Sequence, residues 1–224
     1  MEPPELAKIR KARAAGTKAL DVLEAMVSNR NYDVRLNALE ALAGCTLDLE
    51  PHVRRGMRDR HELVRVTALE LAGEFELTKL EPELVKRFKT DRSRLARSAA
   101  AVALGEMGCV GARRVLEAKI SDSDDWVRVG IYYALVRLGV RKYLTSFMKG
   151  LRHDNYLVRC ATANLALLVV DNKTRAPIVR LLKDALKRET TVAARSSFET
   201  VLKEISKNAA RTRAEKTGQQ VLPD

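Results

Sequence analysis

Residues 122–139 read DSDDWVRVGIYYALVRLG, in which an aspartate precedes a Val-Arg pair that opens an apolar helix face. The same arrangement, a valine or alanine before an arginine at the start of an apolar helix face, recurs six times, and these arginines are 30, 32, 31, 31 and 36 residues apart. They are Arg35, Arg65, Arg97, Arg128, Arg159 and, in a looser match, Arg195. A near-constant period of this length is typical of stacked supersecondary units. The sequence therefore predicts a repeat protein that offers a binding surface, in preference to a buried catalytic cleft.

The spacing of apolar residues within each repeat predicts two helices per unit. We therefore expect an all-α fold, an α-solenoid (superhelix) of about six helix pairs. The first helices are predicted at 17–28, 50–58, 80–89, 111–120, 141–151 and 174–187. The second helices, which carry the arginines, are predicted at 32–43, 61–73, 93–105, 124–138, 155–170 and 190–206.

The sequence predicts that the chain consists of three segments. Residues 1–16 are basic and amphipathic, and they are predicted to form a helix that caps the array. Residues 17–206 hold the repeats, and residues 207–224 are predicted to be a mobile C-terminal tail.

The repeated pattern Asp-x(4–5)-Val-Arg-x-x-Ala-x-x-Ala-Leu-Gly resembles the HEAT repeat. It is most similar to the short form of about 31 residues found in phycobilisome-lyase-like proteins, and the resemblance covers residues 17 to about 206. It implies a structural role in which the repeated charges pair with one another, within a repeat or between repeats, and a partly buried charge needs such a partner. Two departures are Asn29 and Glu189, which stand where the pattern has aspartate. The predicted structural ladder is Arg35, Arg65, Arg97, Arg128 and Arg159 with Asp59, Asp91, Asp122 and Asp154.

Composition favours a cytoplasmic protein. No uninterrupted apolar run reaches the roughly 18 residues that a membrane-spanning helix needs. The start Met1-Glu2-Pro3-Pro4 lacks the apolar core of a secretory signal. The three cysteines, Cys45, Cys109 and Cys160, are far apart and odd in number, which favours a reducing compartment over a disulfide framework.

Sequence motifs give little support for catalysis. His52, His61 and His153 do not have the spacing of metal ligands, and no cysteine pair accompanies them. The dipeptide His61-Glu62 is a single copy of one that HEAT-like deoxyhypusine hydroxylases repeat for a di-iron site, so that activity is not expected. Glycine-rich phosphate loops and nucleophile-elbow motifs do not occur. We therefore predict no catalytic residues, no metal ligands, no cofactor and no enzymatic activity.

The formal net charge of +12 favours an acidic partner, such as nucleic acid or an acidic protein. Basic residues recur at the end of each first helix and in the turn that follows, where they would form a positive ridge able to track a phosphate backbone. The alternative is that lysine and arginine stand there because they favour helix C-termini through the helix dipole. The candidate nucleic-acid-binding residues are Arg54, Arg55, Arg58, Lys86, Arg87, Lys89, Lys149, Arg152, Lys187 and Arg188.

The second helices present another surface, which the family places on the concave side. In the third to fifth repeats its candidate protein-binding residues are Leu95, Val102, Trp126, Tyr133, Leu157 and Asn164, with Trp126 and Tyr133 predicted as exposed anchors. In the first two repeats the same surface carries Asp33, Asn37, Glu40, Thr67, Glu70 and Glu74. A groove with an acidic end and an apolar middle would suit a peptide or helix with a basic terminus. The alternative is that these side chains only complete the packing between repeats.

Three functions are consistent with these observations. The leading hypothesis is a non-enzymatic scaffold or adaptor that binds another protein through the concave face. The second is nucleic-acid binding through the basic ridge, either as an architectural protein or in the manner of the HEAT-like alkylpurine DNA glycosylases. The third, suggested only by the repeat subfamily, is an accessory role in chromophore attachment.

Overall fold

The computed structural model describes residues 7, 9, 11, 20–46, 48–122 and 124–217, with side chains up to Arg211. All regular elements among these residues are α-helices or short 3-10 helices, and they form six consecutive helix pairs. The predicted fold class, an all-α solenoid, is confirmed. The chain divides into two compact units, Met1–Gly139 and Val140–Asp224, which are called unit 1 and unit 2 below.

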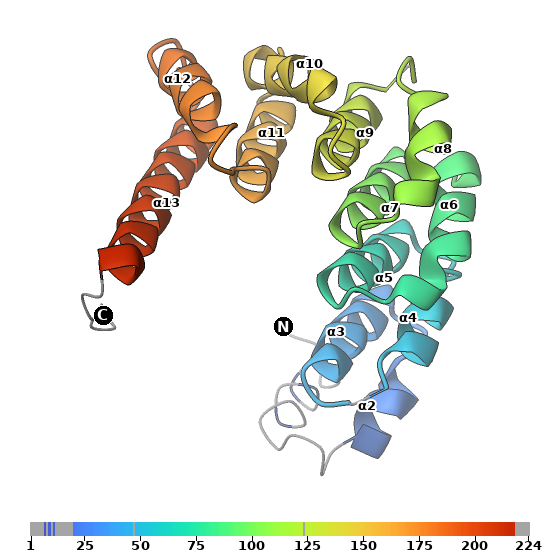
Figure 1. Ribbon diagram of the computed structural model, residues 1–224. Helices are drawn as coiled ribbons and strands as arrows, with labels where there is room; N and C mark the ends of the chain where they lie inside the picture. The colour runs from blue at the N-terminus through green and yellow to red at the C-terminus, as the bar shows by residue number, and fades with distance from the viewer. Residues whose placement is uncertain are drawn as a thin grey trace. The chain divides into compact units, whose positions relative to one another are not determined.

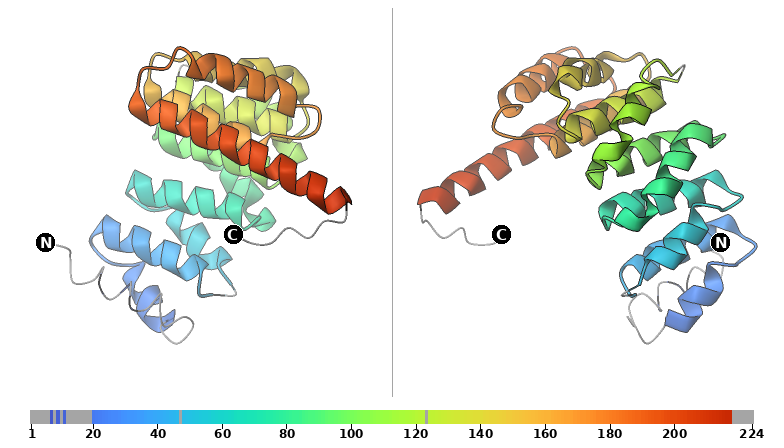
Figure 2. Two further views of the ribbon diagram at one scale, coloured as in Figure 1. Left: turned by 90° about the vertical axis from the view of Figure 1, so that its left-hand side faces the viewer. Right: turned by 45° about the vertical axis from the view of Figure 1, so that its right-hand side comes forward.

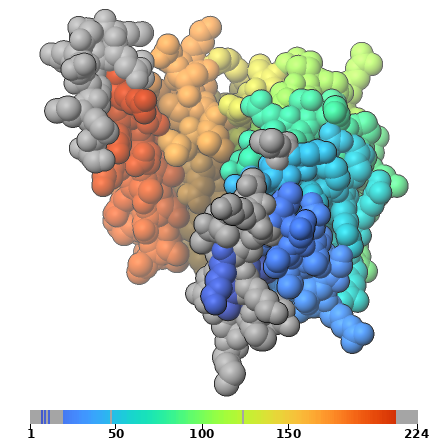
Figure 3. Space-filling model, turned by 90° about the horizontal axis from the view of Figure 1, so that it is seen from below, coloured from blue at the N-terminus to red at the C-terminus, as the bar shows by residue number. Residues whose placement is uncertain are grey.

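Unit 1 contains four helix pairs arranged in two layers (Figure 1). The second helices α3, α5, α7 and α9 lie side by side in one layer, and the shorter first helices form the other. The end of the unit formed by α2 and α3 faces the viewer in Figure 3, in blue. The first helices are α2 (Leu20–Met26), α4 (Glu50–Gly56), α6 (Glu81–Thr90, after the 3-10 turn Thr78–Leu80) and α8 (Arg113–Glu117, after Val110–Ala112). The second helices are α3 (Tyr32–Ala43), α5 (Glu62–Glu74), α7 (Arg94–Glu106) and α9 (Asp125–Arg137).

Unit 2 contains two helix pairs. Its first helices are α10 (Leu144–Met148, flanked by the 3-10 turns Arg141–Tyr143 and Lys149–Arg152) and α12 (Arg175–Leu186). Its second helices are α11 (Tyr156–Leu168) and α13 (Val192–Thr217), which is the longest helix in the described residues and packs against both α11 and α12 (Figure 2).

The predicted helix positions agree with these bounds to within a few residues, with one clear exception. The sequence predicts the last helix to end at residue 206, whereas α13 continues to Thr217, so much of the predicted tail is helical. The remainder of that tail, 218–224, lies outside the described residues. Most of the predicted N-terminal cap, 1–16, lies outside them as well, although Ala7, Ile9 and Lys11 within it are helical.

Local sequence explains where the second helices begin. Asn31, Ser93, Asp124 and Asn155 each precede such a helix, and each side chain accepts a hydrogen bond from a backbone N–H of the first turn. This capping satisfies N–H groups that have no partner inside the helix. The turn residues therefore fix the start of these four second helices, and with it the position of the arginine one turn later.

The core of each unit repeats with the same period as the arginines. The residue three positions after each of the first five arginines is fully buried: Ala38, Ala68, Ala100, Ile131 and Thr162. Small residues bring the second helices of unit 1 into close contact. A Cβ atom added to Gly105 on α7 would lie 2.7 Å from the Cα atom of Ala134 on α9. Because atoms cannot approach so closely, only glycine permits this helix spacing.

The predicted ladder joins neighbouring repeats through paired hydrogen bonds. The Arg35 guanidinium donates to both carboxylate oxygens of Asp59, at 2.7 Å each. Arg65 donates in the same way to Asp91, at 2.8 Å each. Each arginine also donates to backbone carbonyls in the turn before its own helix, such as those of Asn29 and Asp59. One side chain thus fixes its own turn and the turn of the next repeat together.

Further along the chain the ladder differs from the prediction. Arg97 lies 3.8 Å from the carboxylate of Asp122, without the paired geometry. Arg128 forms its ion pair with Asp125, a residue of its own helix. The sequence predicts Asp154 as a carboxylate partner, whereas in the structure its backbone carbonyl accepts a hydrogen bond from Arg159.

Glu189 completes the ladder in unit 2. The Arg159 guanidinium donates to both of its carboxylate oxygens, at 2.6 and 2.9 Å, although the repeat pattern has aspartate at this position. The hydrogen bonds from Arg159 lower the pKa of Glu189 to about 2 against the opposing effect of burial. In unit 1, burial raises the pKa values of Asp59 and Asp91, but hydrogen bonds from Arg35 and Arg65 outweigh it and hold both below the usual range.

We expect Arg65→Met to lower the free energy of unfolding by about 3 kcal/mol, because buried Asp91 would lose its paired hydrogen bonds and keep only the 3.4 Å contact with Arg87. Urea unfolding followed by circular dichroism measures this loss. Arg97→Met is the matched control, since Arg97 is half-buried and its ion pair with Asp122 spans 3.8 Å. We expect the control to lose about 1 kcal/mol. Equal losses in the two variants would contradict the proposed importance of the paired geometry.

Glu189→Gln tests the ladder of unit 2 through its pH dependence. The folded-state pKa of Glu189, about 2, lies below the ordinary value of 4.5, so its charge stabilises the fold above pH 4.5. That contribution is lost as the pH falls from 4.5 toward 2. We expect the variant to have a lower Tm than the natural chain at pH 7, and the difference to shrink over this range in thermal melts. A difference that stayed constant down to pH 2 would show that the Arg159 pair is not its cause.

Candidate functional site

The residues predicted for the concave surface differ in their exposure. In unit 1, Leu95, Val102 and Trp126 are half-buried. In unit 2, Asn164 is exposed and Leu157 is 47% exposed. These five side chains therefore lie at or near the surface of their own units.

Tyr133 was predicted as an exposed anchor, and this prediction is wrong. Its side chain is 0% exposed, beneath the layer of second helices. Burial raises its pKa, and the neighbouring Glu106 carboxylate raises it further. Tyr133 directly precedes Ala134, the residue of α9 that lies against Gly105 of α7, so it stands next to a close contact between these two helices. Tyr133 belongs to the core and offers no contact to a partner.

A pocket of about 430 Å³ lies on the surface of the second helices of unit 1. Three carboxylates surround it, from Glu40 on α3 and from Glu70 and Glu74 on α5, and all three side chains are exposed. None of them forms an ion pair within the described ranges of the chain. Leu71 and Phe75 add an apolar side to the pocket, and Phe75 is 43% exposed. This group of residues is called the acidic pocket below.

The carboxylates of the acidic pocket repel one another. Partial burial raises the pKa of Glu70, and the charges of Glu106, Glu40 and Glu74 raise it further. Burial also raises the pKa of Glu106, which is half-buried on α7. The carboxylates therefore destabilise one another, and a cation placed among them would relieve this repulsion.

Thr67 lies in the wall of the acidic pocket and is 8% exposed. Its hydroxyl has no hydrogen-bond partner in the part of the chain that the structure describes. The hydroxyl of Thr162, on α11, donates to the carbonyl of Val158 in its own helix. A hydroxyl in a pocket wall that has no protein partner can exchange a hydrogen bond with a ligand.

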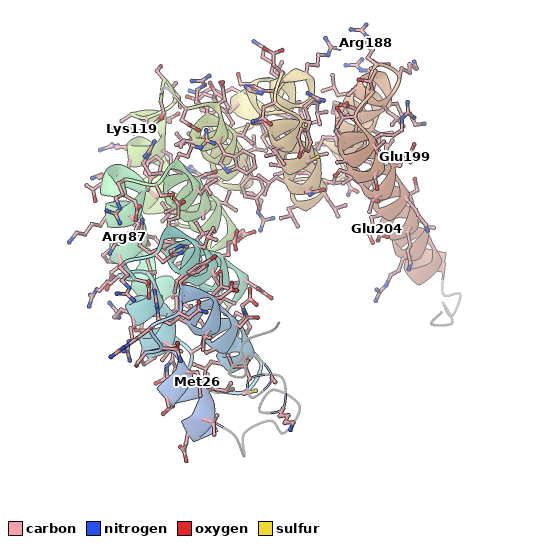
Figure 4. The ribbon with its side chains drawn as sticks, turned by 180° about the vertical axis from the view of Figure 1, so that it is seen from behind. Met26, Arg87, Lys119, Arg188, Glu199 and Glu204 are labelled. Atoms are coloured by element: carbon pink, nitrogen blue, oxygen red, sulfur yellow. The ribbon has the colours of Figure 1, made fainter. Side chains whose placement is uncertain are left out.

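The predicted basic ridge is present in unit 1, but some of its members are neutralised. Arg54 pairs with Glu50 and Glu83, and Arg87 pairs with Asp91. Four further cations, Arg55, Arg58, Lys86 and Lys89, are exposed and form no ion pair among the described residues. Arg87 and Lys119 can be seen on the first-helix side of the unit in Figure 4.

Unit 2 carries the remaining predicted cations. Lys149 and Arg152 lie in the 3-10 turn that follows α10, and both are exposed. Lys187 and Arg188 follow α12, and Lys187 lies 3.3 Å from Asp184. Arg188 lies at the turn after α12 (Figure 4). The predicted ridge residues thus lie at the ends of first helices in both units.

The described residues hold no group of three or more histidine, cysteine, aspartate or glutamate side chains placed to bind a metal ion. His52 lies 3.7 Å from Glu24, and His61 stacks on Tyr32 with ring centroids 3.6 Å apart. None of the helices described is both long enough and apolar enough to cross a membrane.

The sequence did not indicate two residues that contribute to the acidic pocket. Glu106 adds its charge from the end of α7, and Phe75 supplies the exposed ring. Glu106 follows Glu74 by 32 residues, the same distance that separates Arg65 from Arg97. The repeat period could therefore have placed these two carboxylates on neighbouring helices. Phe75 follows the last turn of α5, and no pattern in the sequence indicates its exposure.

Comparisons with known proteins agree with this fold. A family model for HEAT repeats matches residues 19–105, 50–135 and 81–168. Among solved structures, the chain is similar to one described as the complex of CpcE and CpcF of phycocyanin lyase from Nostoc sp. PCC7120. The TM-score is 0.65 with 16% sequence identity, over 90% of this chain and 88% of that one. At this identity the similarity concerns the fold alone.

No curated protein sequence matches the chain. The three overlapping family matches cover well over half of its length. Together with the repeated helix pairs and the arginine ladder, they show that this protein belongs to the HEAT-repeat family.

Proposed function

We propose that this protein is a non-enzymatic scaffold that binds a basic segment of another protein on the second-helix surface of unit 1. The observation that supports this most directly is the acidic pocket, where Glu40, Glu70 and Glu74 meet without an internal cation. A lysine or arginine side chain from a partner would supply the missing positive charge. The oxygen of the Thr67 hydroxyl would accept a hydrogen bond from one of its N–H groups.

The apolar side of the acidic pocket supports the same kind of partner. Lysine and arginine have long hydrocarbon stems beneath their charged groups. Leu71 and Phe75 would contact such a stem while the carboxylates surround its end. The repeated arginines of the protein itself are already held in ion pairs of the ladder, which supports a structural role for them.

Binding of a short arginine-containing helical peptide to the full chain tests this proposal. We expect Glu40→Gln, Glu70→Gln and Glu74→Gln combined to weaken binding about tenfold or more, because each change removes a charge with little change of shape. Fluorescence anisotropy of the labelled peptide measures the affinity.

Glu62→Gln is the control for this experiment, because Glu62 is an exposed glutamate in the first turn of α5 and outside the pocket. An acidic version of the peptide should not bind at this surface. Unchanged affinity of the arginine peptide in the triple variant would rule out the acidic pocket as its binding site, as would an equal loss of affinity for the acidic peptide in that variant.

Nucleic-acid binding remains a second candidate, supported by the exposed cations of unit 1 that have no carboxylate partner. Arg55, Arg58, Lys86 and Lys89 lie at the C-terminal ends of α4 and α6. Cations that neutralise phosphates release counterions, so such binding weakens steeply with salt. Similarity to the phycocyanin lyase structure suggests a third role, in chromophore attachment, and that role rests on the fold alone.

Titration with duplex and single-stranded DNA at two salt concentrations separates this candidate from the scaffold. If the ridge binds phosphates, Lys86→Glu with Lys89→Glu should weaken binding about tenfold and reduce its salt dependence. Lys203→Glu with Lys207→Glu is the matched control, since both lysines are exposed on α13 and the change in net charge is identical. Equal losses in the two double variants would indicate a general charge effect and contradict a role for the ridge.

A further inference from the structure

One side of α12 forms an open, strongly basic surface in unit 2. A shallow groove of about 670 Å³ runs along this helix. Ala176 and Val179 line its apolar part, and lysine and arginine side chains line most of the rest. These residues are called the α12 surface below: Ala176, Val179, Arg175, Arg180, Lys183 and Lys187.

The equivalent surface in an earlier repeat shows which kind of element the α12 surface could contact. Counting back from the carboxylate of the ladder, Glu50 precedes Asp59 by nine residues and Arg180 precedes Glu189 by nine. In the same way, Arg54 on α4 corresponds to Asp184 on α12. The α12 surface is therefore equivalent to the side of α4 that carries Glu50 and Arg54.

On α4 that side receives the first helix of the next repeat. Glu50 lies 3.8 Å from Lys79, in the 3-10 turn that leads into α6. Arg54 forms an ion pair with Glu83 on α6 itself. Within the described part of unit 2, α12 contacts α13 and the 3-10 turn Lys149–Arg152. The side of α12 that corresponds to the ion-pairing side of α4 therefore has no helix of the described part of unit 2 paired with it.

The charges of the α12 surface define the partner. Arg175, Arg180 and Lys183 form no ion pair with any described residue, and the buried Nε of Arg175 has no acceptor. Asp184 is the acidic residue of the groove, and it lies 3.3 Å from Lys187. Four cations against one carboxylate leave a net charge of +3 along the helix.

We propose that the α12 surface binds an acidic amphipathic helix of a partner protein, in the way that α4 receives α6. Apolar side chains of that helix would pack on Ala176 and Val179, as ridges into grooves between stacked helices. Its glutamate or aspartate side chains would pair with Arg175, Arg180 and Lys183. The apolar part of the groove favours a helix over a phosphate backbone, which would bind the cations and leave Val179 uncovered.

A designed peptide provides a defined probe for this proposal. It is a helix with a leucine stripe flanked by glutamates, and a scrambled peptide of the same composition serves as its comparison. We expect binding to the full ¹⁵N-labelled chain to shift backbone amide signals mainly within residues 172–188. The scrambled peptide should bind about tenfold more weakly, because its apolar side chains no longer share one face.

Charge reversal then tests the assigned contacts. We expect Arg180→Glu with Lys183→Glu to weaken binding about tenfold or more, and a lysine version of the peptide to recover binding to this variant. Lys203→Glu with Lys207→Glu is the matched control on α13 and should change the affinity little. Val179→Asp should also weaken binding, with circular dichroism confirming that each variant is folded.

Three outcomes would overturn the proposal. They are amide shifts outside α12, equal binding of the scrambled peptide, and tighter binding of duplex DNA through the same residues. This test does not depend on the acidic pocket. The triple variant Glu40→Gln, Glu70→Gln and Glu74→Gln should bind the acidic peptide with unchanged affinity.

Discussion

The paired hydrogen bonds between an arginine and the carboxylate of the following repeat hold the helix pairs of this protein in register. Arg35, Arg65 and Arg159 each contact both oxygens of their partner and also a carbonyl of their own turn. Each guanidinium therefore connects two turns that are far apart in the sequence. Because these charges are largely buried, removing one partner is costly, and the spacing between repeats has little freedom to vary.

The ladder also determines which charges are available for function. Its arginines and carboxylates lie in the turns and satisfy one another, so they contribute little to recognition. The remaining acidic and basic side chains lie on different parts of the protein. Glutamates gather around the acidic pocket on the second helices of unit 1, whereas unpaired lysines and arginines lie at the ends of first helices and along α12. A chain with a net charge of +12 can therefore offer a basic partner a strongly acidic site.

Both candidate sites follow from the way in which a repeat presents its two helices. The second helices of unit 1 pack closely because small residues separate them, and the ends of α3 and α5 then bring Glu40, Glu70 and Glu74 around one pocket. The first helix α12 exposes a side that α4 uses to receive the next helix. The same repeat geometry thus gives one surface suited to a basic segment and another suited to an acidic helix.

The arginine period and the capping residues alone determined the helix pairs, their order and most of their bounds, because helix starts depend on local hydrogen bonds to Asn31, Ser93, Asp124 and Asn155. The sequence predicted that the repeated arginines and aspartates pair, and the structure shows that Arg35 and Arg65 pair with the aspartate of the following repeat. The tertiary structure decided that Arg128 pairs with Asp125, that Glu189 completes the ladder, and that Tyr133 is buried while Phe75 is exposed. These outcomes depend on how closely neighbouring helices approach, and that distance is set by contacts such as Gly105 against Ala134, between residues of different repeats.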